Sequence, residues 1–421
     1  MAIVVQKYGG TSVADPDRIR AVAKRVMQTQ ALGHQVTVVV SAMGDTTDDL
    51  LQMARRISPN PERRELDLLL SVGERVSMAL LSMAIRELGG NAISFTGSQA
   101  GIITNDRHVD ARIVEVRPFR VQDELARGRI VIIAGYQGVS YRREVTTLGR
   151  GGSDTTAIAM AAALDAEWCE ICSDVDGVYS ADPRVVPNAR RIGSLSHEEM
   201  QEMAEAGAKV LNAQAVEFAK ERGIAIYARA TAQPPPGSPG SPGGDHLSDG
   251  TVVRRFAARP PGTVVGVASE KDLFVLHATL QADALFEFLD TQNVCGKQLH
   301  LTSEANGVNT LTMVISRENL HDEERMRSRL AERFGAAVRL VDGLGAVSVI
   351  GAGINAGYKN VRAGSSALSS LGVRGVSTSS FRITWLVPLA SVDDAVRALH
   401  RTFIEVAPPA ENERLIAEAG V

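Results

Sequence analysis

Aromatic residues are scarce in this chain of 421 residues. Trp, Tyr and Phe make up 4%, so the core must be built mostly from Val, Ile, Leu, Ala and Met. The two signs of charge are nearly balanced, and a formal net charge of -4 gives no general reason to expect nucleic acid or a membrane surface as partner. No uncharged apolar run reaches the roughly 20 residues of a membrane-spanning helix. The N-terminal residues also lack the pattern of a secretory signal, so we expect a cytoplasmic protein.

Cysteine is almost absent too. The chain has three cysteines, an odd number, which argues against a framework of disulfides. Cys169 and Cys172 form a C-x-x-C pattern, but their surroundings are typical of a β-strand, on which residues three apart point to opposite faces. We therefore expect neither a metal site nor a redox pair there.

The length favours two or three domains, because one hydrophobic core rarely organises so many residues. The first half alternates buried-type strands with amphipathic helices, the pattern of a parallel sheet. Asp15 and Pro16 mark the start of the first helix, and Ser196 with Glu199 forms a capping box for a later one. The expected strands are 3–7, 36–40, 92–95, 130–134, 167–173 and 224–229, and the expected helices include 75–88 and 211–222.

Residues 233–245 are a low-complexity run of Pro, Gly and Ser, which we interpret as a solvated insertion near a domain boundary. After residue 262 the pattern changes to two consecutive α+β units of similar length. The expected strands there are 264–267, 273–278, 310–316, 337–340, 346–350 and 383–387, and the expected helices are 282–291, 320–334, 363–371 and 392–403. Few polar groups in this half have a catalytic pattern, so we expect it to be regulatory or oligomeric.

The run from Thr147 to Ala157, Thr-Leu-Gly-Arg-Gly-Gly-Ser-Asp-Thr-Thr-Ala, is the most informative segment for chemistry. Its glycines let an anion approach backbone N–H groups closely, and the helix that follows turns its positive end toward that anion. Arg150 adds a two-pronged donor for a carboxylate or a phosphate. Asp154 does not suit a pure anion site, so we expect it to orient donors or a metal. The pattern indicates a place where two anionic molecules are held together.

Other motifs accompany this run. The chain carries Lys7–Ser12 (KYGGTS), Val40–Gly44 (VSAMG), Gly73–Arg75 (GER), Gly149–Thr156 (GRGGSDTT) and Ser173–Tyr179 (SDVDGVY) with Ala181–Arg184 (ADPR). In order and spacing they resemble the aspartokinases, and the resemblance covers the whole chain. It implies an α/β, three-layer amino-acid-kinase fold with a mostly parallel open sheet at 1–245. Two α+β, ferredoxin-like ACT domains would follow at 262–340 and 341–421.

The resemblance also implies a reaction, transfer of the γ-phosphoryl group of ATP to the β-carboxylate of L-aspartate. Such transfer needs mainly positioning and charge neutralisation, and Mg²⁺ is expected to arrive with ATP, held chiefly by phosphate oxygens. Lys7 and Asp154 are implied to be catalytic, with Asp154 orienting Lys7. Substrate contacts are implied for Ser41, Thr47, Glu74, Arg150, Gly151, Gly152 and Ser153. Nucleotide contacts are implied for Lys7, Tyr8, Gly9, Gly10, Thr11, Ser173, Asp174, Tyr179, Asp182, Arg184 and Lys209.

The chain departs from the family pattern at several places, among them one near the active site and one in the first ACT unit. Asn212-Ala213-Gln214 stands where many members carry an arginine-bearing triplet, and Leu280–Leu285 lacks the proline and glycine of the usual effector turn. Two alternatives therefore stay open: a kinase for another small amino acid in a dedicated pathway, and a non-catalytic amino-acid sensor. The altered turn predicts a weak response, or none, to lysine plus threonine as effectors. Because ACT domains usually pair through sheet edges, a homo-oligomer is expected.

Overall fold

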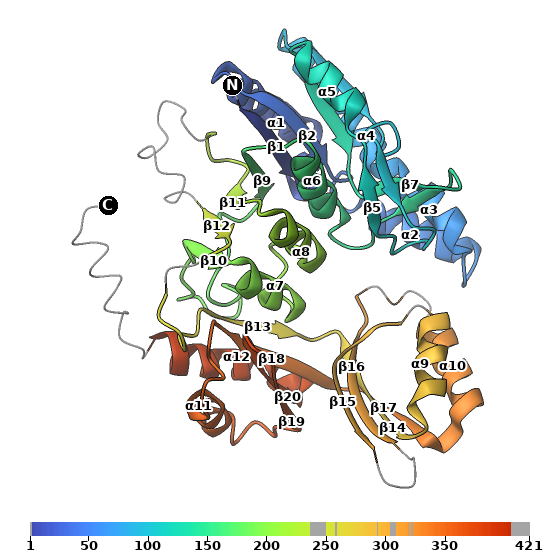
Figure 1. The fold of residues 1–421 in the computed structure, drawn as a ribbon, viewed down its shortest axis with the longest axis vertical. Coiled ribbons are helices and arrows are strands. Elements are labelled where there is room, and N and C mark those ends of the chain that lie inside the picture. Colours follow the sequence, from blue (N-terminus) through green and yellow to red (C-terminus); the bar gives the residue numbers. More distant parts are fainter. Residues whose placement is uncertain are drawn as a thin grey trace, which may run out of the picture. The chain divides into compact units, whose positions relative to one another are not determined.

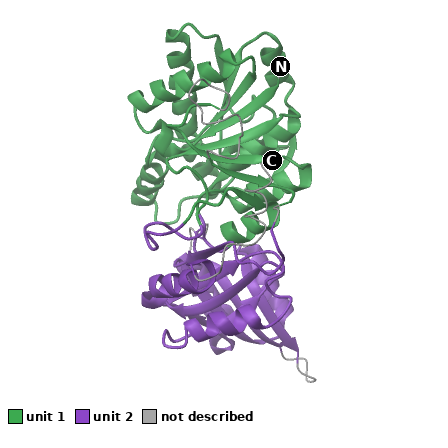
Figure 2. Cartoon of the chain, turned by 90° about the vertical axis from the view of Figure 1, so that its left-hand side faces the viewer, with its two compact units in different colours: residues 1–179, 190–205, 209–258 green, residues 180–189, 206–208, 259–421 purple. Residues whose placement is uncertain are grey.

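The chain divides into two compact units (Figure 2). The first comprises residues 1–179, 190–205 and 209–258, and the second comprises residues 180–189, 206–208 and 259–421. The structure is a computed structural model that describes residues 2–235, 250–256, 259–292, 294–303, 309–318, 320 and 323–405. Most of the insertion expected at 233–245 lies outside the described residues.

The first unit is built on an eight-stranded sheet with the strand order β10-β12-β11-β9-β1-β2-β6-β3 (Figure 1). All neighbours are parallel except β11 and β12, which confirms the mostly parallel open sheet. The strands are β1 Ile3–Tyr8, β2 Gln35–Val40, β3 Ala92–Phe95, β6 Ile130–Ala134, β9 Trp168–Ser173, β10 Ser194–Ser196, β11 Ile226–Ala230 and β12 Thr251–Arg254.

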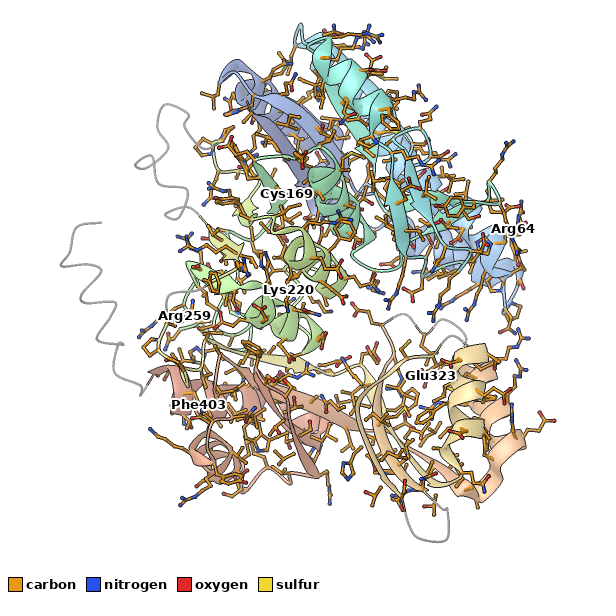
Figure 3. All side chains as sticks on the ribbon, in the orientation of Figure 1. Arg64, Cys169, Lys220, Arg259, Glu323 and Phe403 are labelled. Atoms are coloured by element: carbon orange, nitrogen blue, oxygen red, sulfur yellow. The ribbon has the colours of Figure 1, made fainter. Side chains whose placement is uncertain are left out.

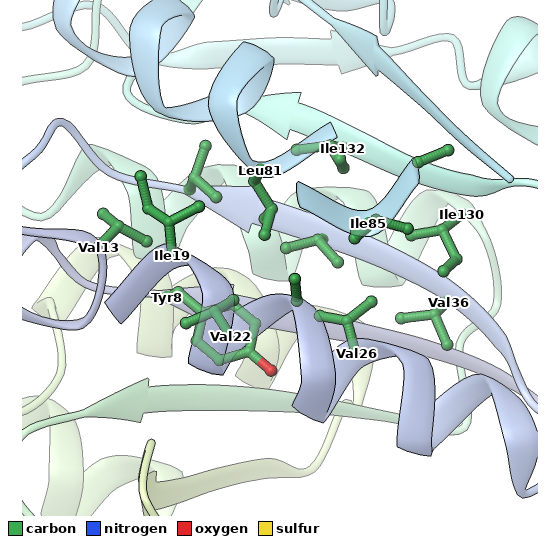
Figure 4. Packing of buried hydrophobic residues seen from close by; sticks show 14 of the residues in the cluster. Tyr8, Val13, Ile19, Val22, Val26, Val36, Leu81, Ile85, Ile130 and Ile132 are labelled. Atoms are coloured by element: carbon green, nitrogen blue, oxygen red, sulfur yellow. The ribbon is translucent and has the colours of Figure 1, made fainter. Parts of the chain in front are cut away.

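Helices α1 (Pro16–Ala31) and α4 (Val72–Glu87) cover one face of this sheet. Asp15 caps α1 as predicted, by accepting a hydrogen bond from the N–H of Arg18 at 2.8 Å. The two helices and the sheet enclose a core of aliphatic side chains (Figure 4). Its members include Tyr8, Val13, Ile19, Val22, Val26, Val36, Leu81, Ile85, Ile130 and Ile132. This core contains almost no aromatic residues. The alternation along the strands and the three-to-four-residue spacing along the helices place Val, Ile and Leu on the facing surfaces, and these side chains fill the core.

Helix α6 (Gly152–Ala163) lies against the opposite face, and α8 (Ala213–Arg222) packs on α6. α6 is buried over Gly152–Ala161, and its small side chains allow that close packing. The capping box of α7 (His197–Glu205) is confirmed: Ser196 N–H donates to Glu199 at 2.9 Å, and Glu199 N–H donates to the Ser196 hydroxyl at 3.1 Å.

A second, four-stranded sheet of the first unit has the order β5-β4-β7-β8. Its strands are β4 Ile102–Thr104, β5 Ile113–Val116, β7 Gln137–Ser140 and β8 Val145–Thr147. The remaining helices of the unit are α2 Thr46–Ile57, α3 Arg63–Leu70 and α5 Phe119–Ala126. The strands of this sheet are three or four residues long. A strand this short is difficult to predict, because an alternation of apolar and polar residues needs about four to eight residues to be recognised.

The three cysteines are free thiols. Cys169 and Cys172 lie buried on β9, and Cys169 is labelled in Figure 3. Cys172 belongs to the core beneath α1, and residues three apart on a strand point to opposite faces. The two sulfurs therefore lie on opposite faces of the sheet, and burial raises the pKa of both.

One helical stretch, Arg63–Glu87, is long and apolar enough to span a membrane by length and composition. It consists of α3 and α4, which are joined at Ser71. Leu81 and Ile85 of this stretch are fully buried in the core of the first unit. Packing inside the protein accounts for part of its apolar character, whereas Val72, Val76 and Met83 of the same stretch are exposed.

The second unit contains two four-stranded sheets, each with two helices. One module runs β14 Leu273–Leu280, α9 Ala282–Thr291, β15 Gly296–Ser303, β16 Asn309–Ser316, α10 Glu323–Phe334 and β17 Val338–Val341. The other runs β13 Gly266–Glu270, β18 Leu344–Ile350, α11 Lys359–Ala367, β19 Gly375–Thr378, β20 Arg382–Pro388 and α12 Val392–His400. The first module has the βαββαβ order of a ferredoxin-like domain.

The strand pairing divides the second unit differently from the boundaries expected at 262–340 and 341–421. β13 precedes the first module in the sequence, yet it pairs with β18 in the sheet β13-β18-β20-β19. The first module is thus inserted between β13 and the rest of the second. A second difference is α11, which begins at Lys359 rather than at 363, because its first turn has no apolar periodicity that would mark the start.

Candidate functional site

Lys7 and Asp154 form the centre of the candidate site. Lys7 lies on β1 and points to the face that α6 covers, where its Nζ is 2.6 Å from a carboxylate oxygen of Asp154. Asp154 lies in the first turn of α6, where the helix dipole also favours a negative charge. The two side chains are only 12% and 8% exposed, so water screens their attraction weakly. The structure therefore brings together the two residues that the sequence singled out for catalysis.

Two residues of the predicted nucleotide site are placed differently. Side chains alternate along a strand, so Tyr8 points away from Lys7 into the core beneath α1, with no exposed surface. Its hydroxyl donates to Gln6 at 3.2 Å. The N–H of Gly9 is bonded to the carbonyl of Cys172 at 3.1 Å. The Tyr8 side chain and the Gly9 N–H thus already have partners within the protein, and a nucleotide contact at these two residues stays a prediction for their other backbone groups.

Three of the sequence motifs meet at Ala42. A Cβ on Gly10 would lie 3.0 Å from the carbonyl oxygen of Ala42, and a Cβ on Gly73 would lie 2.7 Å from the Cβ of Ala42. The N–H of Gly44 donates to Gly10 at 3.1 Å. Glycine is required at positions 10 and 73 because the chain segments approach so closely. Ser41 and Thr47 are half-buried beside this junction, in the turn after β2 and in the first turn of α2.

Glu74 follows Gly73 in the first turn of α4 and is 3% exposed. One carboxylate oxygen accepts a hydrogen bond from the N–H of Ala42 at 3.1 Å. The other oxygen, Oε2, is buried and has no hydrogen-bond partner among the described residues. Burial raises the pKa of the Glu74 carboxyl to about 7. A buried carboxylate with one oxygen unused is suited to a cationic ligand group.

The glycine-rich run forms a tight turn that leads into α6. Gly149 and Gly151 have φ values of 72° and 70°, a left-handed conformation that glycine adopts without strain. Arg150 and Gly151 are exposed, whereas Gly152 and Ser153 are buried at the helix start. A Cβ on Gly135 would lie 2.8 Å from the Cβ of Ser153, so the chain before β7 also touches this turn.

Asn212 holds the same turn from α8, and sequence reasoning missed this role. Its side-chain oxygen accepts from the N–H of Ala215 at 3.2 Å and so caps the helix, while its amide donates to the carbonyl of Arg150 at 2.8 Å. A Cβ on Gly151 would lie 2.5 Å from the Asn212 side chain. The departure from the family triplet therefore has a structural purpose. An N-cap signal was visible in the sequence, but the contact with Arg150 was not.

Replacing Asn212 by alanine is expected to lower the stability of the first unit by about 1–2 kcal/mol, because an N-cap bond and a bond to Arg150 are both lost. Thermal unfolding followed by circular dichroism measures the change. Asn212→Asp keeps the cap but not the amide donor, so it should recover about half of the loss. An unchanged melting temperature for Asn212→Ala would contradict this interpretation.

The remaining nucleotide-site residues are divided between the two units. In the first unit, the carbonyl of Ser173 accepts from the N–H and the hydroxyl of Thr231, at 2.8 and 3.0 Å. The Thr231 hydroxyl lies 2.6 Å from that of Ser12, which ties the glycine turn after β1 to the end of β9. Thr11, Asp174 and Lys209 are exposed, and the Tyr179 hydroxyl donates to Asp176 at 2.8 Å. Asp182 and Arg184 belong to the second unit, where they form an ion pair of 2.7 Å.

The arrangement in the first unit combines groups of two kinds. A buried cation, a glycine turn and a helix N-terminus suit phosphate oxygens and developing negative charge. A buried carboxylate with an unused oxygen suits an ammonium group, and an exposed guanidinium suits a carboxylate. Together they suit the meeting of a nucleoside triphosphate with a free acidic amino acid.

Comparison with known proteins agrees with this geometry. The family model described as "Amino acid kinase family" matches residues 2–228. The aspartokinase of Mycolicibacterium smegmatis is 46% identical over 415 residues, which cover 96% of this chain and 96% of that protein. The chain belongs to the aspartokinases. Among solved structures, E. coli aspartokinase III in complex with aspartate and ADP (R-state) matches with a TM-score of 0.81 and 26% identity, over 95% of this chain and 99% of that one.

The same E. coli enzyme in complex with lysine and aspartate (T-state) matches this aspartokinase with a TM-score of 0.69 and 25% identity, over 96% of this chain and 99% of that one. The family and the fold class predicted from the motifs are thereby confirmed. Neither a kinase for a different acid nor a non-catalytic sensor is favoured for an aspartokinase with these matches.

Proposed function

We propose that this chain transfers the γ-phosphoryl group of ATP to the β-carboxylate of L-aspartate, forming 4-phospho-L-aspartate. A β-carboxylate oxygen attacks the γ-phosphorus, the bond from that phosphorus to the β–γ bridging oxygen breaks, and ADP leaves. The observation that carries the proposal is the Lys7–Asp154 ion pair at the first turn of α6, in a chain 46% identical to an aspartokinase.

Charge neutralisation is the main task of the site, because an anionic acceptor must approach an anionic donor. Lys7 would place its ammonium group beside the transferred phosphoryl group, and Asp154 would fix the direction of that ammonium group. The acceptor carboxylate is already ionised at neutral pH, so the reaction requires no general base. Positioning and one buried positive charge therefore provide most of the catalysis in this proposal.

The acceptor would be held at both ends of its amino-acid backbone. Arg150 would bind the α-carboxylate through its two-pronged guanidinium. Glu74 would bind the α-ammonium group with Oε2, since Oε1 is already bonded to Ala42. Further contacts are assigned to the hydroxyls of Ser41, Thr47 and Ser153 and to the backbone of Gly151 and Gly152.

The nucleotide would lie along the turn after β1 and the end of β9. E. coli aspartokinase III, solved with ADP, supports nucleotide use by this fold. Contacts are assigned to Lys7, Gly10, Thr11, Ser173, Asp174, Tyr179 and Lys209. The described residues contain no group of three or more His, Cys, Asp or Glu that could hold a metal. Mg²⁺ is expected to arrive with ATP, held chiefly by phosphate oxygens, and would supply neutralising charge there.

Trapping of the acyl phosphate with hydroxylamine tests the proposed reaction. The purified chain is incubated with ATP, Mg²⁺ and each of a panel of acidic amino acids, and the hydroxamate is measured. Hydroxamate from L-aspartate, dependent on Mg²⁺, supports the proposal. Product from another acid alone, or from none, refutes it.

The second unit is proposed to bind an amino-acid effector and to pair two or more copies of the chain. The E. coli relative solved with lysine supports effector binding by this family. The turn at Leu280–Leu285 lacks proline and glycine, so we expect little inhibition by lysine plus threonine at millimolar levels. Titration of the initial rate with both amino acids measures it. Strong inhibition at sub-millimolar concentration would contradict the expectation.

A further inference from the structure

A line of hydrogen-bonded side chains runs beside the glycine-rich turn and has no part in the reaction described above. Asp67 of α3 lies at its centre, with no exposed surface. One of its oxygens lies 2.6 Å from Nδ1 of His108. The other accepts from the hydroxyl of Thr147 at 2.5 Å and from the N–H of Val109 at 3.0 Å. A fully buried carboxylate is costly, and these three partners offset the cost only if all of them stay in place.

Thr147 extends the line to Tyr136. Burial raises the pKa of the Tyr136 hydroxyl, and a hydrogen bond with the Thr147 hydroxyl opposes that rise. The residue is also attached to the glycine-rich run in several places. Its N–H donates to the Thr156 hydroxyl at 3.2 Å, and its carbonyl accepts from Leu148 at 2.9 Å. A Cβ on Gly152 would lie 3.1 Å from the Tyr136 ring. Tyr136 therefore touches the run before, at and after the turn that presents Arg150.

Both ends of the line have an unusual backbone conformation. Val109 and Tyr136 have φ values of 73° and 67°, a left-handed region that non-glycine residues rarely adopt, β-branched valine least of all. Such conformations cost of order 1–3 kcal/mol each and persist where the surrounding contacts determine them, often at functional sites. The bond from the Val109 N–H to Asp67 is one of those contacts.

The line ends among the groups assigned to the amino-acid substrate. The Tyr136 ring lies beside Gly152, which is assigned to the substrate, and the charges of Glu74 and Arg150 act on its hydroxyl. At its other end, His108 is 20% exposed, on the loop between β4 and β5. A movement of that loop would thus be transmitted through Asp67 and Thr147 to the turn that carries Arg150.

We propose that His108, Asp67, Thr147 and Tyr136, here named the Asp67 relay, are positioning residues that fix the Arg150 turn for the amino-acid substrate. The inference rests on the proposed function, because it assigns that turn to aspartate. It makes the affinity for aspartate, and not that for ATP, depend on the loop between β4 and β5. None of the four side chains needs to touch substrate for this effect.

Tyr136→Phe deletes one oxygen atom and is the first test. Initial rates with each substrate varied in turn are expected to show KM for aspartate raised about fivefold, as for the loss of one hydrogen bond, with KM for ATP changed less than about twofold. Tyr141→Phe is the matched control, since the Tyr141 hydroxyl donates to Glu115 at 3.0 Å on the exposed side of the same sheet. The relay is refuted if Tyr136→Phe leaves KM for aspartate unchanged, or if the control raises it equally.

A double-mutant cycle separates a relay from independent structural effects. His108→Ala alone is expected to raise KM for aspartate to a similar extent, and the combination with Tyr136→Phe should add little, because the line is already broken. If the double variant raises KM for aspartate by the product of the two single increases, the proposal is overturned. Thr147→Val should resemble His108→Ala, and Thr147→Ser, which keeps the hydroxyl, should restore the wild-type KM. If circular dichroism shows that Thr147→Val does not fold, the KM of Tyr136→Phe for aspartate still tests the relay.

The wild-type protein distinguishes failure of the relay from failure of the proposed function. If the wild type forms no acyl phosphate from aspartate, the proposed function is wrong. If the wild type turns over aspartate normally and KM is insensitive to the relay variants, only the relay is wrong.

Discussion

Replacing Lys7 by alanine is expected to lower kcat at least about a hundredfold, the usual cost of removing one preorganised contact to transition-state charge. The Lys7 ammonium group lies 2.6 Å from Asp154, which orients it, and is largely shielded from water, so water screens its charge weakly. Release of ADP in a coupled assay, at saturating aspartate and ATP, measures the effect.

Lys24→Ala is the matched control, because Lys24 is exposed on α1, on the opposite side of the sheet. It should retain wild-type kcat. ATP binding by calorimetry should remain measurable in Lys7→Ala, which separates a lost transition-state contact from a lost nucleotide site. A kcat within about tenfold of the wild type would remove Lys7 from the mechanism. Asp154→Asn is expected to cause a comparable loss, because it leaves the ammonium group without its orienting charge.

Local signals allowed much of the first unit to be predicted. Asp15 with Pro16, and Ser196 with Glu199, are caps whose bonds span only three residues, so the sequence contains both partners within one turn of helix. The strands at 92–95 and 130–134 were predicted with the bounds that β3 and β6 have. Lys7 and Asp154 were singled out as catalytic because each lies in a motif, and the structure places them within one ion pair.

The parts that could not be predicted depend on long-range pairing. β13 joins β18 across a whole inserted module, and nothing in its own five residues indicates that partner. Asn212 and Arg150 are 62 positions apart, and Asp67 and Thr147 are 80 apart, so no spacing rule connects them. Tyr8 is a case of another kind. The motif was assigned to the nucleotide as a block, although strand alternation already requires that Lys7 and Tyr8 point to opposite faces.

Glu74→Gln is expected to raise KM for aspartate at least about tenfold, because a hydrogen bond between opposite charges is replaced by a weaker neutral one. The amide oxygen of glutamine can still accept from the N–H of Ala42, so the packing of α4 is retained. In the wild type, burial raises the pKa of the Glu74 carboxyl to about 7, and its protonated form cannot pair with an ammonium group. KM for aspartate in the wild type should therefore fall about tenfold between pH 6 and pH 8. The glutamine variant should show no such fall, and parallel profiles would contradict the assignment.

The same carboxyl has the opposite effect on stability. Its pKa in the folded state is raised above the ordinary 4.5, so the folded protein binds more protons than the unfolded chain and loses stability as the pH rises from about 4.5 to about 7. Without aspartate, Glu74→Gln should therefore melt at the same temperature as the wild type or higher at pH 8, and the difference should shrink toward pH 5. Added aspartate should raise the melting temperature of the wild type more than that of the variant, since it binds only the folded state. A variant that melts below the wild type at pH 8 would mean that the carboxylate stabilises the fold. Its Oε2 atom would then have a structural role and would not be available to bind the substrate.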